Sequence, residues 1–150
     1  ASDVYKRQVI EYNCRFGDPE TQPIMHRLRD DLGALCLAAL DGRLDEMPAD
    51  WDPRPAVGVV LAAGGYPGSY EKGHQIKGLK AAWPATTKVF HAGTQQVGDN
   101  VVTQGGRVLC VSALGDSIAD AITAAYAGVD QISWEGMVCR RDIGWRAIDR

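Results

Sequence analysis

The amino-acid sequence predicts an α+β fold, in which an isolated strand and helix precede a compact antiparallel sheet with one helix against it. Two observations support this prediction. Short apolar runs alternate with glycine- and proline-rich turns, which is typical of antiparallel strands. Two other segments repeat apolar residues at steps of three and four, which is typical of helices. With 150 residues, 45% of them hydrophobic, the chain is long enough to form a core.

The expected elements follow from these periods in chain order. Strands are expected at residues 9–13, 56–63, 88–92, 95–103 with a turn at 98–100, and 107–113, and helices at 21–42 and 118–129. Thr21 caps the first helix and Pro23 lies in its first turn, whereas Ser117 or Asp116 caps the second. Gly105 and Gly106 are interpreted as a hairpin turn between two strands.

Charge and cysteine content exclude several classes of function. The net charge is −3 and both signs are mixed along the chain, so nucleic acid and anionic membranes are not expected as partners. No apolar run approaches the roughly 20 residues of a membrane span, and we expect a cytoplasmic protein. The four cysteines lack zinc-site spacing, and Cys36 and Cys110 are expected in the core.

Glu11 and Asn13 are candidate metal ligands. They lie two residues apart on an expected strand, so both side chains project from the same face. A carboxylate beside an amide oxygen suits a hard cation such as Mg²⁺. Taken alone, the pair is more simply explained as polar residues that face solvent.

The run that follows Asn13 is more specific. Residues 15–22 read Arg-Phe-Gly-Asp-Pro-Glu-Thr-Gln, and together with residues 9–14 they resemble the final strand and loop of the ATP-grasp domain of glycinamide ribonucleotide synthetases. Later segments are similar to the same family in order and spacing: 62–68, 88–94, 105–109 and 141–147. The resemblance covers residues 9–150 and implies that 9–45 end the ATP-grasp domain with a connecting helix and that 46–150 form the C-terminal domain.

The resemblance implies an activity and a set of partners. The enzyme would be a phosphoribosylamine–glycine ligase of purine biosynthesis, which uses ATP to convert glycine into glycyl phosphate and then joins it to 5-phosphoribosylamine. Glu11 and Asn13 would hold the Mg²⁺ or Mn²⁺ that bridges the ATP phosphates. The remaining partner would be the N-terminal part of the same enzyme, without which we expect no activity.

Candidate catalytic and binding residues follow from the same motifs. Arg15 either holds a substrate anion or acyl phosphate, or pairs with Asp18 or Glu20 to fix the loop. Asp18 and Glu20 are candidates for orienting an amine, although Asp18 is also a turn residue before Pro19. The turn Gly64-Gly65-Tyr66-Pro67-Gly68 is a candidate phosphoribosyl cradle, although a simple tight turn is the favoured interpretation of such a sequence.

Two other functions remain as hypotheses. One is a stand-alone module that binds a phosphoribosyl ligand or forms a dimer, and the other is a different ATP-grasp ligase. The residues 15–22 argue against the latter. Residues 1–8 show no period that leads into the first strand and are interpreted as a non-native leader, which favours a truncated enzyme over a stand-alone module.

Overall fold

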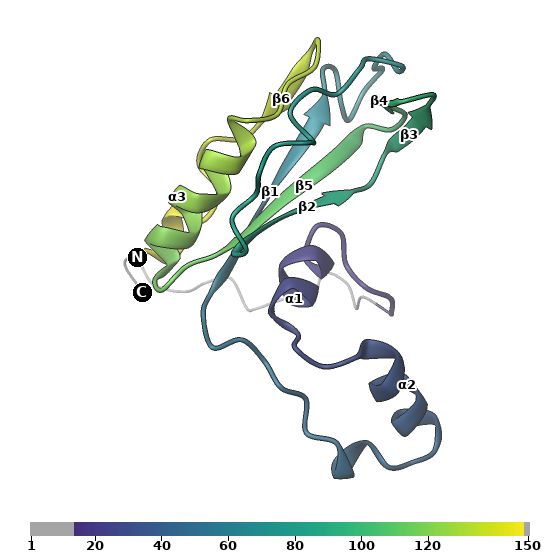
Figure 1. Ribbon diagram of the computed structural model, residues 1–150, viewed down its shortest axis with the longest axis vertical. Helices are drawn as coiled ribbons and strands as arrows, with labels where there is room; N and C mark the ends of the chain where they lie inside the picture. The colour runs from purple at the N-terminus through teal and green to yellow at the C-terminus, as the bar shows by residue number, and fades with distance from the viewer. Residues whose placement is uncertain (1–13, 149–150) are drawn as a thin grey trace, which may run out of the picture.

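The computed structural model describes residues 14–148 and has a four-stranded antiparallel sheet at its centre, in the order β2-β5-β1-β6 (Figure 1). A two-stranded sheet of β3 and β4 lies at one end. The strands are β1 (Ala56–Ala63), β2 (Thr87–His91), β3 (Thr94–Val97), β4 (Asn100–Thr103), β5 (Arg107–Leu114) and β6 (Met137–Cys139). The helices are α1 (Thr21–Arg27), α2 (Leu32–Leu40) and α3 (Ile118–Val129), with 3-10 turns η1 (Leu44–Glu46) and η2 (Trp145–Ala147). The predicted α+β class is confirmed, whereas the strand expected at 9–13 lies outside the described residues.

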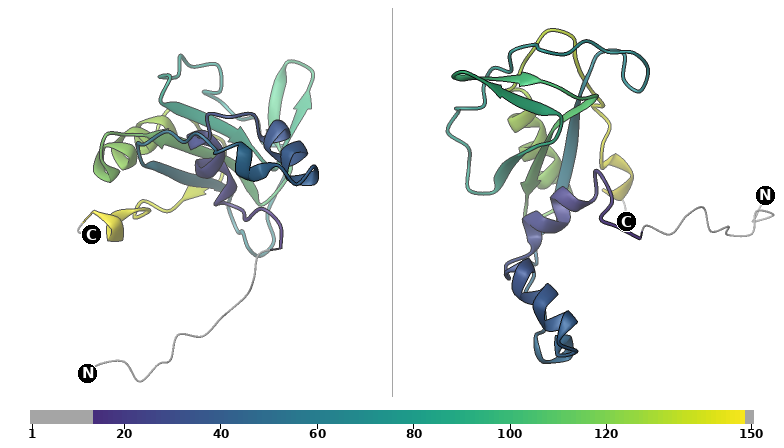
Figure 2. Two further views of the ribbon diagram at one scale, coloured as in Figure 1. Left: turned by 90° about the horizontal axis from the view of Figure 1, so that it is seen from below. Right: turned by 90° about the vertical axis from the view of Figure 1, so that its right-hand side faces the viewer.

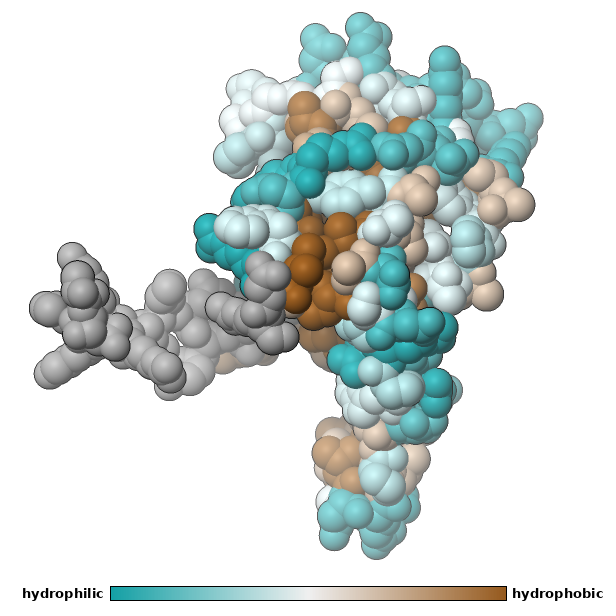
Figure 3. Space-filling view, turned by 90° about the vertical axis from the view of Figure 1, so that its left-hand side faces the viewer, coloured by the Kyte–Doolittle hydropathy of each residue, from teal (hydrophilic) through white to brown (hydrophobic). Residues whose placement is uncertain are grey.

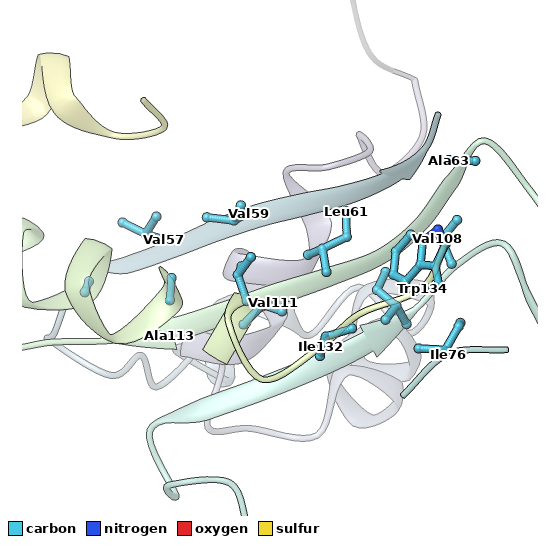
Figure 4. Close-up of a cluster of buried hydrophobic side chains, with 14 residues drawn as sticks. Val57, Val59, Leu61, Ala63, Ile76, Val108, Val111, Ala113, Ile132 and Trp134 are labelled. Carbon is cyan, nitrogen blue, oxygen red and sulfur yellow. The ribbon is translucent and has the colours of Figure 1, made fainter. Parts of the chain in front are cut away.

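The hydrophobic core lies between α3 and one face of the large sheet. On β1 every second residue points into this core, namely Val57, Val59 and Leu61. Figure 4 shows these side chains beside Val111 and Ala113 of β5, the strand that pairs with β1. The apolar run 56–63 therefore forms the central strand that its composition predicts.

The helix α3 begins where the sequence predicts. Ser117 is its N-cap, and its side chain accepts a hydrogen bond from the backbone of Asp120, whose carboxylate accepts from the backbone of Ser117 in return. Of the two candidate caps, the structure selects Ser117. Ala121 and Ala125 of α3 are fully buried, and such small side chains let the helix lie close to the sheet.

The helix α1 packs on the opposite face of the sheet. A Cβ atom added at Gly58 would lie 3.3 Å from Cδ of Pro23 and 3.2 Å from Sγ of Cys110, so a glycine on β1 admits this helix. His26 of α1 is hydrogen-bonded through Nδ1 to the hydroxyl of the fully buried Ser112, at 3.0 Å. Cys110 is buried, as predicted.

The single helix predicted at 21–42 is wrong, because the structure divides it into α1 and α2. Leu28 adopts an extended conformation with ψ of 122°. The backbone N–H of Arg29 then donates to the carbonyl of Asp50 at 3.0 Å instead of continuing the helix. Asp31 caps α2 by accepting from two backbone N–H groups of the first turn. A capping residue inside the apolar period thus restarts the helix in a new direction.

Residues 29–50, which we call the α2 arm, project away from the sheet (Figure 2). The base of the arm is closed by Asp52. Its backbone N–H donates to the carbonyl of Arg27 at 2.7 Å, and the Arg27 guanidinium donates to the Asp52 carbonyl at 3.1 and 3.0 Å. The Asp52 carboxylate accepts from Arg54 and Arg29. These bonds hold both ends of the arm together against the body.

The α2 arm carries an exposed apolar patch, which appears as the pale brown area on the lower projection in Figure 3. Leu37 and Leu40 keep 65% and 84% of their surface exposed. Only Ala38 of α2 is buried. Cys36 is exposed too, so its predicted place in the core is wrong: the apolar run around it faces solvent in this structure.

Replacing the carboxylate at the base of the arm is expected to destabilise the fold in a pH-dependent way. Hydrogen bonds from Arg54 hold the pKa of Asp52 well below its ordinary value of 3.8. A depressed carboxyl pKa stabilises the folded state above about pH 4, and that stabilisation is lost as pH falls. Asp52→Asn should therefore lower the free energy of unfolding at pH 7, by an amount that shrinks towards pH 3 in urea titrations. Asp45→Asn on the exposed η1 is the control, and a pH-independent difference for Asp52→Asn would contradict the interpretation.

Close backbone approaches explain the paired glycines between β4 and β5. The predicted hairpin at Gly105-Gly106 is wrong, because β4 and β5 belong to different sheets. A Cβ atom at Gly93 would lie 2.5 Å from Cα of Gly105, and one at Gly106 would lie 2.2 Å from the Tyr66 ring. The glycines therefore let two backbone segments touch and let the Tyr66 ring pack against the residue before β5.

Candidate functional site

A groove of about 580 Å³ lies on the sheet face that does not carry α3. Its floor is formed by the small and apolar residues Gly58, Val60 and Ala62 of β1. The other lining residues come from four further segments: Pro19, Tyr66, Arg107, Val138, Cys139, Arg140 and Ile143. An apolar floor with arginines and a tyrosine around it suits a ligand that carries both apolar and anionic groups.

The loop before α1 is attached to this groove by Arg107. One guanidinium nitrogen, Nη1, donates to the backbone carbonyl of Asp18 at 2.9 Å, and Nη2 lies 3.2 Å from the Asp18 carboxylate. The second carboxylate oxygen of Asp18 accepts from the Gln22 side chain at 3.2 Å. The candidate catalytic residue Asp18 is therefore held by two partners, at the edge of a groove that Pro19 lines.

The glycine-rich turn after β1 contributes one side chain to the groove. Residues 64–67 form a turn, as predicted, and Tyr66 lines the groove next to Arg107. Gly64 faces a different, smaller pocket, which His74 also lines. Gly65 has a φ of +94°, and Pro67 and Gly68 are exposed on the outer side of the turn. Of the five residues predicted to cradle a phosphoribosyl group, the structure brings only Tyr66 to the groove.

The two other loop candidates lie apart from the groove lining. Glu20 lines a separate groove of about 720 Å³ beside α1, together with Trp51. Arg15 is exposed at the start of the loop, and both interpretations of its role stay open. The printed sequence thus places three candidates within six residues, but the fold directs Asp18 and Glu20 to different surfaces.

The predicted metal ligands Glu11 and Asn13 lie outside the described residues. Within residues 14–148, no three His, Cys, Asp or Glu side chains are arranged to hold a metal ion. The chemistry of the predicted pair, a carboxylate and an amide oxygen, fits a hard cation and stays a prediction. In the same range, no helix is long and apolar enough to cross a membrane.

Sequence reasoning missed three residues on this face of the sheet. Arg107 and Arg140 were not candidates, because lone arginines near strand ends carry no motif. His26 was assigned no role, yet it is hydrogen-bonded to Ser112 under α1. Burial lowers the pKa of His26 from 6.5, and the nearby charge of Lys88 lowers it further, so the imidazole is neutral at pH 7. A neutral, packed histidine of this kind joins α1 to the sheet.

The fold and the groove define a class of protein: an α+β domain that holds a polar loop against one face of its sheet. The particular family follows from comparison with known proteins. Residues 56–146 match the family model described as phosphoribosylglycinamide synthetase, C domain, and the chain belongs to this family. The resemblance predicted from the motifs is confirmed.

Curated relatives agree with this assignment. Proteins named phosphoribosylamine–glycine ligase are 63% identical in Vibrio cholerae, 62% in Allochromatium vinosum and 59% in Escherichia coli, each over 95% of this chain. The chain spans about a third of their length, 33% for the Vibrio relative. A crystal structure of phosphoribosylamine–glycine ligase from Thermotoga maritima superposes with a TM-score of 0.75 at 35% identity, over 89% of this chain and 32% of that one.

Proposed function

We propose that this chain supplies the C-domain part of a ligase that joins glycine to 5-phosphoribosylamine at the expense of ATP. The observation that carries the proposal is the loop of residues 15–22, whose Asp18 is held against the groove by Arg107. A relative with 63% identity bears the name of this ligase. The cytoplasmic location expected for purine synthesis remains part of the same proposal.

The proposed reaction has two steps. A carboxylate oxygen of glycine attacks the γ-phosphorus of ATP, which gives glycyl phosphate and releases ADP. The amine of phosphoribosylamine then attacks the acyl carbon, phosphate leaves, and the amine loses a proton as the amide of glycinamide ribonucleotide forms. Both steps bring anions together, so positioning and neutralisation of charge supply most of the catalysis.

The loop residues receive their roles from this chemistry. Arg15 has a planar cation that suits the glycine carboxylate or the acyl phosphate. Asp18 or Glu20 is proposed to orient the attacking amine, since the two side chains lie at different surfaces. Glu11 and Asn13 are proposed to hold Mg²⁺ or Mn²⁺, which would neutralise charge on the ATP phosphates when bound.

The α2 arm supports the view that this chain works with further polypeptide. Its exposed leucines include Leu37, Leu40 and Leu44, and soluble proteins rarely leave such apolar patches uncovered. The relatives contain about twice as much additional chain as the part matched here. We propose that this additional part covers the arm, and we expect no ligase activity without it.

A chimera tests the proposal directly. Residues 9–150 are joined to the remaining two-thirds of the Vibrio cholerae relative, and ADP release is measured with ATP, Mg²⁺, glycine and phosphoribosylamine. The chimera should turn over only when all substrates are present, and the chain alone should not. The alternative, a stand-alone binding module, is favoured if the chimera is inactive while the chain alone binds a phosphoribosyl ligand in calorimetry. The intact Vibrio enzyme is the positive control.

A further inference from the structure

A β-bulge at the start of β5 determines where Arg107 points. Leu61 of β1 pairs with Leu109, but the next residue, Ala62, pairs with Arg107, so Val108 is an extra residue in β5. Because of the extra residue, the side chain before the bulge projects from the opposite face of the sheet to the one it would have in a regular strand. In a regular strand Arg107 would share the α3 face with Leu109, where a guanidinium would lie in the hydrophobic core.

The bulge places the apolar Val108 in the core and the charged Arg107 on the opposite face. Val108 is fully buried in the core, and Figure 4 shows it beside Trp134. Arg107 is directed to the face of Ala62 instead, where it lines the groove. The Tyr66 ring packs against the adjacent Gly106 and so restrains the segment just before the bulge. The start of β5 is therefore shaped to present an arginine to the groove.

Arg107 uses its position to hold the loop at two points. Nη1 bonds the backbone carbonyl of Asp18 and Nη2 pairs with its carboxylate, across 89 residues of sequence. A planar guanidinium that contacts a main-chain and a side-chain atom of one residue restrains both its location and its orientation. Arg15 and Glu20 lie three residues before and two residues after this point.

We propose that Arg107 is a positioning residue for the ligase reaction: it fixes the loop around Asp18 so that Arg15 and Glu20 meet the reacting groups in one geometry. This inference rests on the proposed function. The proposed role of Arg107 is to act through Asp18, because both terminal nitrogens of the guanidinium contact that residue. Contacts from the sheet domain thereby fix the position of the loop. Misplacement of the loop by about 1 Å costs on the order of 100-fold in rate.

Steady-state kinetics of the chimera test the proposal. Arg107→Ala is expected to lower kcat by about 100-fold, with the KM for ATP changed by less than about twofold. Arg107→Lys keeps the charge but not the two-point contact, so it should recover only part of kcat. Arg141→Ala is the matched control, since Arg141 pairs with Asp130 at 2.7 Å away from the groove and should leave kcat unchanged.

A second measurement separates this proposal from the proposed function. Hydrogen exchange of the backbone amides of residues 14–22 is compared in the chain with and without Arg107→Ala, and exchange should accelerate there and not in α3. If exchange is unchanged, the proposal is wrong. It is also wrong if the chimera is active and Arg107→Ala leaves kcat intact, or raises only the KM for phosphoribosylamine, which would indicate direct binding of the substrate. If the unsubstituted chimera is inactive, the proposed function fails and the catalytic role of Arg107 falls with it.

Discussion

Glu11→Ala in the chimera is expected to lower the rate of ADP release by about a thousandfold while leaving its melting temperature unchanged. A metal ion that neutralises phosphate charge is worth several kcal/mol in the transition state, and each 1.4 kcal/mol corresponds to a factor of about ten. The carboxylate is the only anionic member of the proposed pair with Asn13, so its loss should weaken the site most.

The controls for this prediction lie in the same chain. Glu46→Ala removes an exposed glutamate of η1, on the α2 arm, and should leave the rate within about twofold. Asn13→Asp retains an oxygen ligand and should keep more activity than Glu11→Ala. If Glu11→Ala and Glu46→Ala have equal rates, the metal assignment is wrong even if the ligase assignment is correct.

Leu61→Ala is expected to lower the free energy of unfolding of the chain by about 3 kcal/mol. Leu61 is fully buried on β1, between its partners Leu109 of β5 and Cys139 of β6, so its truncation leaves a cavity as well as losing apolar contact. Urea denaturation followed by circular dichroism measures the change. A loss below about 1 kcal/mol would contradict the packing of β1 described above.

Leu37→Ala on α2 is the matched control, because it removes the same atoms from an exposed position. In the chain alone it should change the free energy of unfolding by less than about 0.5 kcal/mol. In the chimera the same substitution should destabilise, since we propose that the additional polypeptide covers the arm. An effect that is equally small in the chimera would show that Leu37 stays exposed there.

Much of the sheet domain was predictable because its periods are local. The run 56–63 is apolar with glycine at its end, and the structure has β1 at those residues. The capped apolar stripe of 118–129 became α3 with the same bounds. The three residues of β6 were not predicted, because so short a strand has no period of its own and forms only by pairing with the end of β1.

The helix of residues 21–42 shows where local pattern misleads. Its apolar spacing continues across the break, so periodicity alone gives one helix. The break instead depends on Asp50 and Asp52, about two dozen residues later, whose backbone atoms bond those of Arg29 and Arg27. A competing hydrogen bond from a distant segment cannot be seen in a window of neighbouring residues.

For the site, the motif of residues 15–22 and the turn at Tyr66 were found from the sequence, and so was the family. Chain order alone determined these features, because the residues that make each motif are neighbours. Only the tertiary structure decided that Pro19 of the loop and Tyr66 line one groove, that Glu20 lines another, and that Arg107 holds the loop through Asp18. The physical reason is that a one-residue bulge reverses the face of a side chain, and the pairing that creates it joins strands about fifty residues apart.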